Sequence, residues 1–265
     1  MYNRYQLAKK YLHYYFTASN GKGHGIHSPF VFQFINNVLR DKKPYPCFSA
    51  IEKVRKELTH SRKIIEVKDF GAGSSVIKSN HRKVGDIARS SLKSRKIAQL
   101  LFRMVQYYRP AILLELGTSF GTTSAYLASA NPDATLFTCE GANTIAAIAR
   151  NNFSILGINN IKLIEGDFAR TLPILFSTTS NIDFAFLDGN HRKGPTLNYF
   201  HELLNHSANS TILVFDDIHW SAEMESAWKE IQQHPKVTLT LDLFYIGVVF
   251  LNPDIMVKQD FIIRY

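Results

Sequence analysis

Short apolar runs alternate with helix-length amphipathic segments along the C-terminal two thirds of the chain. The apolar runs are continuous, which is typical of strands buried on both faces of a parallel sheet. They cover residues 111–116, 135–139, 161–164, 182–187 and 211–215. The segments between them have the length of helices and cover residues 121–130, 142–156, 168–176 and 195–205. This alternation predicts an α/β fold with a doubly wound, mostly parallel sheet.

The two ends of the chain depart from this alternation. After a helix-length segment at 220–232, the apolar runs 237–244 and 247–251 lie close enough to form a C-terminal antiparallel hairpin, which makes seven strands in all. Near the N-terminus, helix-length patterns occur at 5–16, 30–40 and 92–108, whereas residues 61–90 show no clear period. We therefore expect a mainly helical N-terminal extension (residues 1–90) followed by an α/β domain (residues 91–265).

The composition is that of an ordinary globular protein. Of the 265 residues, 45% are apolar and 20% charged. The longest apolar run, residues 244–251, is far shorter than the ~20 residues of a membrane helix, and the N-terminus lacks the pattern of a signal peptide. Two cysteines, Cys47 and Cys139, cannot build a disulfide framework or a zinc site unaided. A cytoplasmic location is the expectation.

Positive charge is concentrated in the first 100 residues. They hold 20 Lys/Arg against 6 Asp/Glu, whereas the remaining residues hold 11 against 16. This asymmetry indicates either an anionic partner or substrate, or simply a solvated basic surface. The aromatic and basic segment around Tyr5 and Tyr11 could bind nucleic acid or a membrane surface. The alternative is that its aromatic residues pack on their own domain or on the second copy of a homodimer.

Candidate ligand-binding residues follow the first strand of the α/β domain, because ligands of such sheets bind beyond the carboxyl ends of the strands. This strand ends in Glu115-Leu-Gly117-Thr-Ser-Phe-Gly121. Gly117 permits a sharp turn close to a ligand, and Gly121 lets the next helix begin against the strand. The amides at that helix start favour a carboxylate or phosphate, although such turns also occur for structural reasons alone.

Acidic residues end the second and third strands. Glu140, 23 positions after Gly117, suits an acceptor for both hydroxyls of a ribose. The third strand runs into Glu165-Gly166-Asp167, which could place a carboxylate near an adenine amino group. Asp167 could equally cap the following helix, and the two roles are compatible. Together these residues predict a cofactor that contains a nucleoside.

The ordered series ELGTSFG, TCE, EGD, FLDGNH and VFDD resembles the class I S-adenosylmethionine-dependent methyltransferases, over about residues 92–250. The similarity is greatest to the catechol and caffeoyl-coenzyme A O-methyltransferase branch. It implies a Rossmann-like fold and S-adenosylmethionine as cofactor. A dehydrogenase would need a GxGxxG turn, which this chain lacks. The resemblance implies cofactor contacts by Glu115, Gly117, Thr118, Ser119, Gly121, Thr123, Glu140, Gly141, Asp167, Phe168 and Asp188.

The resemblance also implies a metal site. Metal-dependent members of the branch bind a divalent cation through an aspartate after strand four and an Asp-Asn pair after strand five, and Asp188 and Asp216-Asp217 occupy the matching positions. Mg²⁺ there would lower the pKa of an acceptor hydroxyl. Asp217 departs from the pattern, since it replaces the asparagine. The alternative is that Asp188 contacts the cofactor and the pair serves as loop and helix-cap residues.

A histidine stands where the branch has a lysine base. An imidazole ordinarily titrates near neutral pH, so His191, three residues after Asp188, could accept the proton of the acceptor hydroxyl. His219 is the competing candidate. A second glycine-rich turn at residues 69–74 is expected to border the acceptor pocket, where His81-Arg82-Lys83 would face an anionic group.

These observations predict in-line O-methylation of a small or medium-sized hydroxylated acceptor, which the basic N-terminal region would allow to be anionic, with residues 1–60 as a lid. One alternative is an RNA or protein methyltransferase that uses the basic N-terminal region. The other is a non-catalytic cofactor-binding scaffold.

Overall fold

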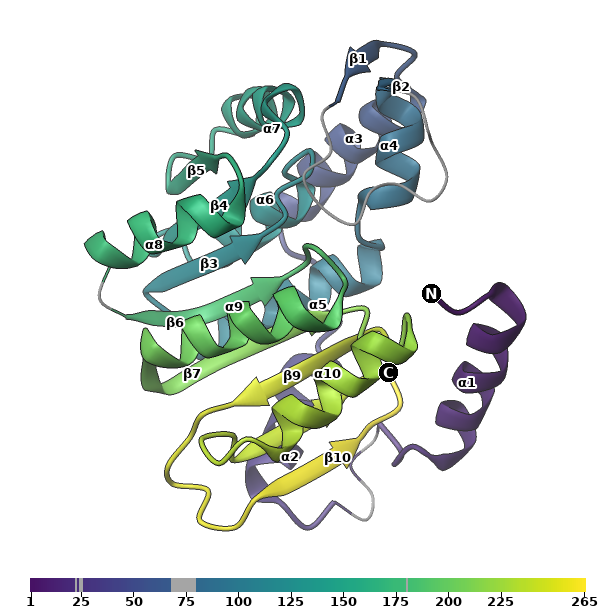
Figure 1. The fold of residues 1–265 in the computed structure, drawn as a ribbon, viewed down its shortest axis with the longest axis vertical. Coiled ribbons are helices and arrows are strands. Elements are labelled where there is room, and N and C mark those ends of the chain that lie inside the picture. Colours follow the sequence, from purple (N-terminus) through teal and green to yellow (C-terminus); the bar gives the residue numbers. More distant parts are fainter. Residues whose placement is uncertain (22, 24–25, 68–79, 180) are drawn as a thin grey trace. The chain divides into compact units, whose positions relative to one another are not determined.

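The computed structural model describes residues 1–21, 23, 26–67, 80–179 and 181–265, and the chain forms two compact units (Figure 1). The first unit comprises Met1–Asp41 together with Ser180–Tyr265, and the second is Lys42–Thr179. The α/β fold with a mostly parallel sheet and flanking helices, expected from the sequence, is confirmed. The assignment of residues 1–90 and 91–265 to two domains stays a prediction.

The second unit contains three parallel strands in the order β3-β4-β5. Leu113 and Leu114 of β3 are fully buried, as the continuous apolar run predicted. The helix after β3 consists mostly of small and apolar residues and is almost entirely buried. The strands and the helices that follow them are β3 (Ile112–Leu116), α6 (Thr122–Ala130), β4 (Thr135–Glu140), α7 (Asn143–Ile155), β5 (Ile161–Glu165) and α8 (Phe168–Thr178).

The N-terminal half of the second unit is mainly helical. Its elements are α3 (Cys47–His60), β1 (Ile64–Glu66), β2 (His81–Lys83), α4 (Val84–Ser91) and α5 (Arg95–Tyr108). Helix α3 buries Ile51, Val54 and Leu58, which recur at helical spacing, and it contacts both α4 and α6. The antiparallel pair β1–β2 explains the lack of a clear period in residues 61–90, because three-residue strands are too short to show one. Residues 69–74, the second glycine-rich turn, lie outside the described residues.

The first unit contains five strands in the order β10-β8-β9-β7-β6. They are β6 (Ile182–Leu187), β7 (Ser207–Asp216), β8 (Leu239–Asp242), β9 (Ile246–Phe250) and β10 (Gln259–Ile262). Strands β8 and β9 form the expected antiparallel hairpin. Strand β10, which pairs in parallel with β8, was not expected, because its residues alternate between partly buried and exposed and form no continuous apolar run. The described parts of the sheet thus hold eight strands instead of seven.

Five helices complete the described part of the first unit: α1 (Arg4–Thr17), α2 (Pro29–Phe34), the π-helix η1 (Ile35–Leu39), α9 (Lys193–Asn205) and α10 (Ala222–Gln233). Helix α1 packs through Tyr14, whose hydroxyl donates a 2.5 Å hydrogen bond to the carbonyl of Ile263. Helix α2 packs through Phe34, whose ring centroid lies 5.9 Å from that of Phe250. None of the helices described is both long and apolar enough to cross a membrane.

Candidate active site

The glycine-rich turn after β3 adopts backbone angles that favour glycine. Gly117 and Gly121 have φ values of 101° and 79°, in the left-handed region. The N–H of Gly117 donates a 3.0 Å hydrogen bond to the carbonyl of Cys139, which ties the turn to the end of β4. A Cβ atom at Gly121 would overlap the ring of Phe153. The turn therefore requires glycine at both of the positions singled out from the sequence.

Glu140 at the end of β4 is hydrogen-bonded to this turn. One oxygen of its carboxylate accepts a 2.8 Å hydrogen bond from the backbone N–H of Ser119, and the other accepts one of 3.0 Å from Ala142. Ser119 itself has a left-handed φ of 47°, which helps its N–H point at the carboxylate. The end of β5 joins the same group of backbone atoms, since the N–H of Gly166 donates to the carbonyl of Glu140 at 2.9 Å. Gly117, Ser119 and Glu140, expected to share a ligand, are thus brought together.

Glu115 lies beneath the turn as a fully buried carboxyl group. Its Oε2 accepts hydrogen bonds from the hydroxyls of Ser124 and Thr138, and the Thr138 hydroxyl also lies 2.6 Å from that of Thr118. Burial raises the pKa of Glu115 to about 7. Its Oε1 is buried without a hydrogen-bond partner among the described residues. A buried, unpartnered oxygen is costly, and such groups are common where a ligand or water completes the site.

The remaining predicted cofactor residues lie near these groups in the sequence and carry structural roles. Asp167 caps α8 by accepting a 3.0 Å hydrogen bond from Ala169, so the helix-cap role is confirmed. Phe168, the first residue of α8, is half-buried, and Thr123 in α6 is buried. Gly141 follows Glu140 directly and is half-buried. For all four, contact with a cofactor remains a prediction.

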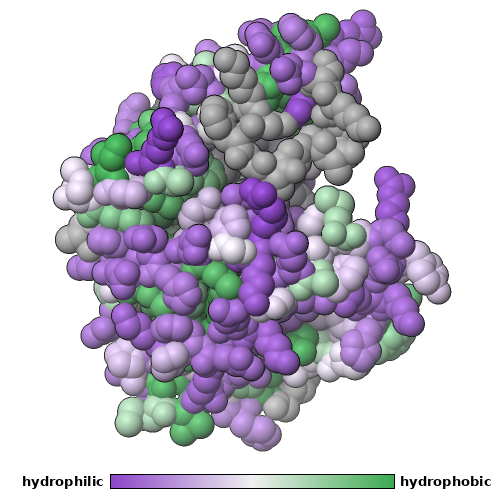
Figure 2. All heavy atoms as spheres, in the orientation of Figure 1, coloured by the Kyte–Doolittle hydropathy of each residue, from purple (hydrophilic) through white to green (hydrophobic). Residues whose placement is uncertain are grey.

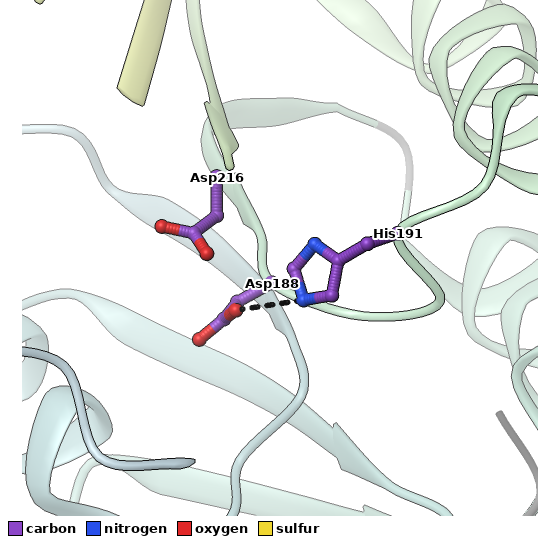
Figure 3. Close-up of side chains that lie close together, drawn as sticks. All are labelled: Asp188, His191 and Asp216. Atoms are coloured by element: carbon purple, nitrogen blue, oxygen red, sulfur yellow. Dashed lines mark ion pairs between the residues drawn. The ribbon is translucent and has the colours of Figure 1, made fainter. Parts of the chain in front are cut away.

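Asp188, His191 and Asp216 form a cluster in the first unit (Figure 3). Asp188 follows β6, His191 lies in the loop after it, and Asp216 ends β7. One ligand atom from each lies within 4.8 Å of the others, and His191 Nε2 is 3.5 Å from Asp188 Oδ1. Asp216 is buried, and the other two are partly buried. Two carboxylates and an imidazole are a donor set that fits a divalent cation.

Asp217 lies next to this cluster rather than in it. Its Oδ2 is 4.0 Å from His191 Nδ1, and its left-handed backbone (φ 55°) is held by a 2.7 Å hydrogen bond from its N–H to the carbonyl of Tyr245. The structure thus joins two of the three expected metal ligands, and His191 takes the third place in the cluster. An imidazole nitrogen broadens the range of suitable ions from Mg²⁺ to Mn²⁺, Fe²⁺ or Zn²⁺.

His219, the other candidate base, has both ring nitrogens bonded to carboxylates. Nδ1 lies 3.0 Å from Glu225 Oε1 and Nε2 lies 2.7 Å from Asp242 Oδ2. Burial disfavours the charged imidazole, but these two hydrogen bonds outweigh it and raise the pKa of His219. A histidine held in this way is poorly suited to accept a further proton, so His219 has a structural role here. Glu225 also accepts hydrogen bonds from Tyr2 and Lys10 of the N-terminal segment.

An aromatic pocket of about 240 Å³ lies beside Asp217, within the first unit. Its walls come from α1, from the loop after β7 and from the turn between β8 and β9. The ring of Tyr11 meets that of Phe244 edge-on, with centroids 5.0 Å apart, and the His219 ring stacks on Phe244 with centroids 5.2 Å apart. The lining residues are Leu7, Ala8, Tyr11, Asp217, His219, Trp220, Phe244 and Tyr245.

The sequence motifs did not reveal Tyr11, Glu225 or Phe244 as parts of this region. Tyr11 lies more than 200 positions before Glu225 and Phe244, and none of the three belongs to a recognisable motif. The only signal was the aromatic content of the N-terminal helix. His81, Arg82 and Lys83 form β2 in the second unit, and their role toward an anionic acceptor stays a prediction.

Residues 114–218 match the family model described as a methyltransferase domain. This segment includes the glycine turn, Glu140 and the Asp188–His191–Asp216 cluster. This segment is therefore similar to known methyltransferase domains. A curated relative, the O-methyltransferase imqG of Aspergillus flavus, is 30% identical over 111 residues, which are 40% of this chain and 44% of that protein. The match therefore spans less than half the length of this relative.

Solved O-methyltransferase structures share the fold of most of this chain. An O-methyltransferase from Bacillus cereus in complex with SAH has a TM-score of 0.56 at 18% identity, covering 83% of this chain and 97% of that one. The O-methyltransferase TomG from Streptomyces achromogenes, involved in tomaymycin synthesis and solved in complex with SAM, also has a TM-score of 0.56 at 18% identity, with coverages of 79% and 91%. At this identity the likeness concerns the fold.

Proposed function

We propose that this protein is an S-adenosylmethionine-dependent O-methyltransferase whose cofactor is held by the glycine turn and Glu140. The observation that carries the proposal is the hydrogen bond between Ser119 N–H and the Glu140 carboxylate. It fixes an acidic acceptor, suited to ribose hydroxyls, beside a turn whose glycines adopt left-handed backbone angles. The neighbours solved with SAM and SAH support the same cofactor. The unpartnered Oε1 of Glu115 supports a polar ligand above the turn.

Asp188, His191 and Asp216 are proposed to act on the acceptor hydroxyl. In the transfer, the acceptor oxygen forms a bond to the methyl carbon as the bond from that carbon to sulfur breaks, so the hydroxyl proton must leave. The His191 imidazole, 3.5 Å from Asp188, can take this proton and is stabilised as a cation by the carboxylate. A divalent metal, when bound by the cluster, would supply Lewis acidity that lowers the pKa of the hydroxyl.

The aromatic pocket beside Asp217 is the proposed acceptor site, with α1 as one wall. In this proposal only α1 contacts the acceptor, instead of a lid made of all residues 1–60. Helix α3, which belongs to that range, packs in the core of the second unit. The eight lining residues include no lysine or arginine, and they include the carboxylate of Asp217. The pocket therefore supports a neutral hydroxylated ring more than the anionic acceptor that the charge of the N-terminal region suggested.

The other hypotheses rest on weaker support. An RNA or protein methyltransferase would need a surface for a large substrate, whereas this pocket is small, about 240 Å³, and is lined by residues of a single unit. A non-catalytic scaffold would have no need for the Asp188–His191–Asp216 cluster. A small-molecule acceptor fits the O-methyltransferase neighbours. Nucleic acid, a membrane surface and a second copy of the chain remain proposals as partners, and a cytoplasmic location remains a prediction.

The decisive experiment combines calorimetry with a methylation assay. The protein should bind S-adenosylmethionine and S-adenosylhomocysteine and ignore NAD. Radiolabelled methyl groups should then pass to members of a phenol library but not to nucleosides or RNA. Binding of NAD with no binding of S-adenosylhomocysteine would exclude the proposal. Cofactor binding without turnover on any acceptor, with or without added divalent metal, would favour the scaffold instead.

A further inference from the structure

Helix α1 is apolar on two opposite faces. Leu7, Tyr11 and Tyr14 point toward the first unit, where Tyr14 is only 5% exposed. On the other side, Tyr5, Leu12 and Phe16, which we call the outer face of α1, are 79%, 55% and 76% exposed. Positions 5, 12 and 16 fall on one side of a helix because they are spaced by seven and four residues. The inner face accounts for the packing of α1, whereas the side chains of the outer face remain largely exposed.

The outer face is presented on an ordered helix. The side chains of Asn3 and Gln6 form a capping box at its start. Lys10 and Tyr2 are bonded to Glu225 at 2.9 and 2.8 Å, and Tyr14 is bonded to Ile263. These contacts all lie on the side of α1 that faces its own unit. A partner that docks on the outer face would therefore pay little conformational entropy, since the helix is already formed and attached.

The charges that α1 itself carries are all positive. Lys9 falls among its three apolar residues at helical spacing, Arg4 borders it, and α1 contains no acidic residue. The first acidic residue of the chain is Asp41, whereas residues 1–40 contain five lysines and arginines. In Figure 2, strongly hydrophilic atoms lie next to pale and green ones in the region of α1. Apolar side chains interleaved with basic ones are typical of helices that lie in a membrane interface.

We propose that the outer face of α1 docks on an anionic lipid surface, with Tyr5, Leu12 and Phe16 inserted and Arg4 and Lys9 at the headgroups. A second copy of the chain fits less well, because a twofold contact through this face brings like charges together with no acidic side chain to pair them. Nucleic acid also fits less well, since Leu12, near the middle of the face, offers no ring for stacking on bases. The long Lys9 side chain can reach the headgroups while its methylene groups stay at the apolar level.

The test is co-sedimentation of the full-length protein with vesicles. The anionic vesicles contain phosphatidylcholine with roughly 30% phosphatidylglycerol, which supplies the negative charge. Binding to them should exceed binding to pure phosphatidylcholine at least tenfold and should weaken with salt. The double variant Leu12→Ser/Phe16→Ser should lose at least tenfold in affinity, and Lys9→Glu should lose severalfold. Ile155→Ser/Ile174→Ser removes equally exposed apolar residues (62% and 68%) from the second unit and serves as the matched control, as Lys229→Glu does for charge.

Each outcome decides for or against the lipid surface. Circular dichroism and an unchanged melting temperature confirm that the serine variant is folded, which is expected because both residues are exposed. Equal binding to neutral and anionic vesicles, or equal loss in the control variants, would overturn the proposal. It would also be overturned if the wild-type protein did not bind the anionic vesicles. Dimer formation or RNA binding that Leu12→Ser/Phe16→Ser abolished would then assign the outer face to that partner instead. The outcome is independent of methyl transfer, so it does not depend on the proposed enzymatic function.

Discussion

The backbone N–H of Ser119 donates a 2.8 Å hydrogen bond to the carboxylate of Glu140. Ser119 lies in the turn between β3 and α6, and Glu140 ends the neighbouring parallel strand β4, so the bond orients the carboxylate toward this turn. A second bond from Ala142 restricts the carboxylate further. An acidic group oriented in this way is prepared for hydroxyl donors on a ligand, so it meets them without reorganising.

Replacing Glu140 with alanine should weaken S-adenosylhomocysteine binding by ~1–3 kcal/mol, since the ribose hydroxyls lose their acceptor. Isothermal titration calorimetry measures the change. Glu165→Ala is the matched control, because Glu165 ends the next strand but forms an ion pair with Arg150. Equal losses in the two variants would remove Glu140 from the cofactor site.

Gly121→Ala should destabilise the protein more than Gly157→Ala does. Both glycines have positive φ, 79° and 66°, so both substitutions carry the backbone cost of about 1 kcal/mol. Only at Gly121 does the new methyl group overlap the ring of Phe153, whereas nothing lies within 4 Å at Gly157. Overpacking adds about 1–3 kcal/mol, which chemical denaturation can resolve. Similar losses in both variants would show that the helix and ring separate easily.

Glu115 should make stability depend on pH. Its pKa is about 7 in the folded protein because of burial, against 4.5 for an ordinary glutamate, so the folded state holds this proton more tightly. The unfolding free energy should therefore fall as pH rises from about 4.5 through 7, by roughly 3 kcal/mol from this group, and change no further above that range. Glu115→Gln lacks this titration. Urea denaturation of both proteins from pH 4 to 8.5 isolates the contribution of Glu115 to the unfolding free energy. Parallel pH profiles of the two proteins would contradict this contribution.

Chelation separates two roles for His191. If Asp188, His191 and Asp216 hold a divalent ion, EDTA should abolish methyl transfer and Mn²⁺ or Mg²⁺ should restore it, while Asp188→Asn and Asp216→Asn should lower bound metal and activity together. The exposed residue Asp254 supplies the control variant Asp254→Asn. Full activity after exhaustive chelation would leave His191 as a base without metal, and His191→Asn should then reduce kcat about 10²- to 10⁴-fold.

Tyr11→Ala removes one wall of the aromatic pocket. The KM for the acceptor should rise severalfold, while the affinity for S-adenosylhomocysteine should stay the same, because the predicted cofactor contacts at Gly117 and Glu140 belong to the second unit. Tyr5→Ala, on the opposite side of the same helix, controls for changes in helix stability. Steady-state kinetics with one phenol acceptor provides the measurement. An unchanged KM would mean that the acceptor binds elsewhere.

Local patterns were sufficient for most of the second unit and for the order of its motifs. The continuous apolar run of β3 predicted a buried strand because such a strand needs apolar residues on both faces. Gly121 was predicted to let the next helix begin against the strand, whereas the neighbour that excludes a side chain there is Phe153 of α7. Strand β10 could not be predicted, since an edge strand with one exposed face has too few apolar residues to stand out.

The chain by itself determined which residues end the strands, and with them Gly117, Glu140, Asp188 and Asp216 as candidates. Only the tertiary structure decided which side chains come together. His191 joins the carboxylate cluster where Asp217 was expected, and hydrogen bonds to Glu225 and Asp242 at both ring nitrogens disfavour His219 as a base. The physical reason is that strand ends follow from local burial and backbone geometry, whereas ligand sets and ion pairs depend on distances between residues far apart in the sequence.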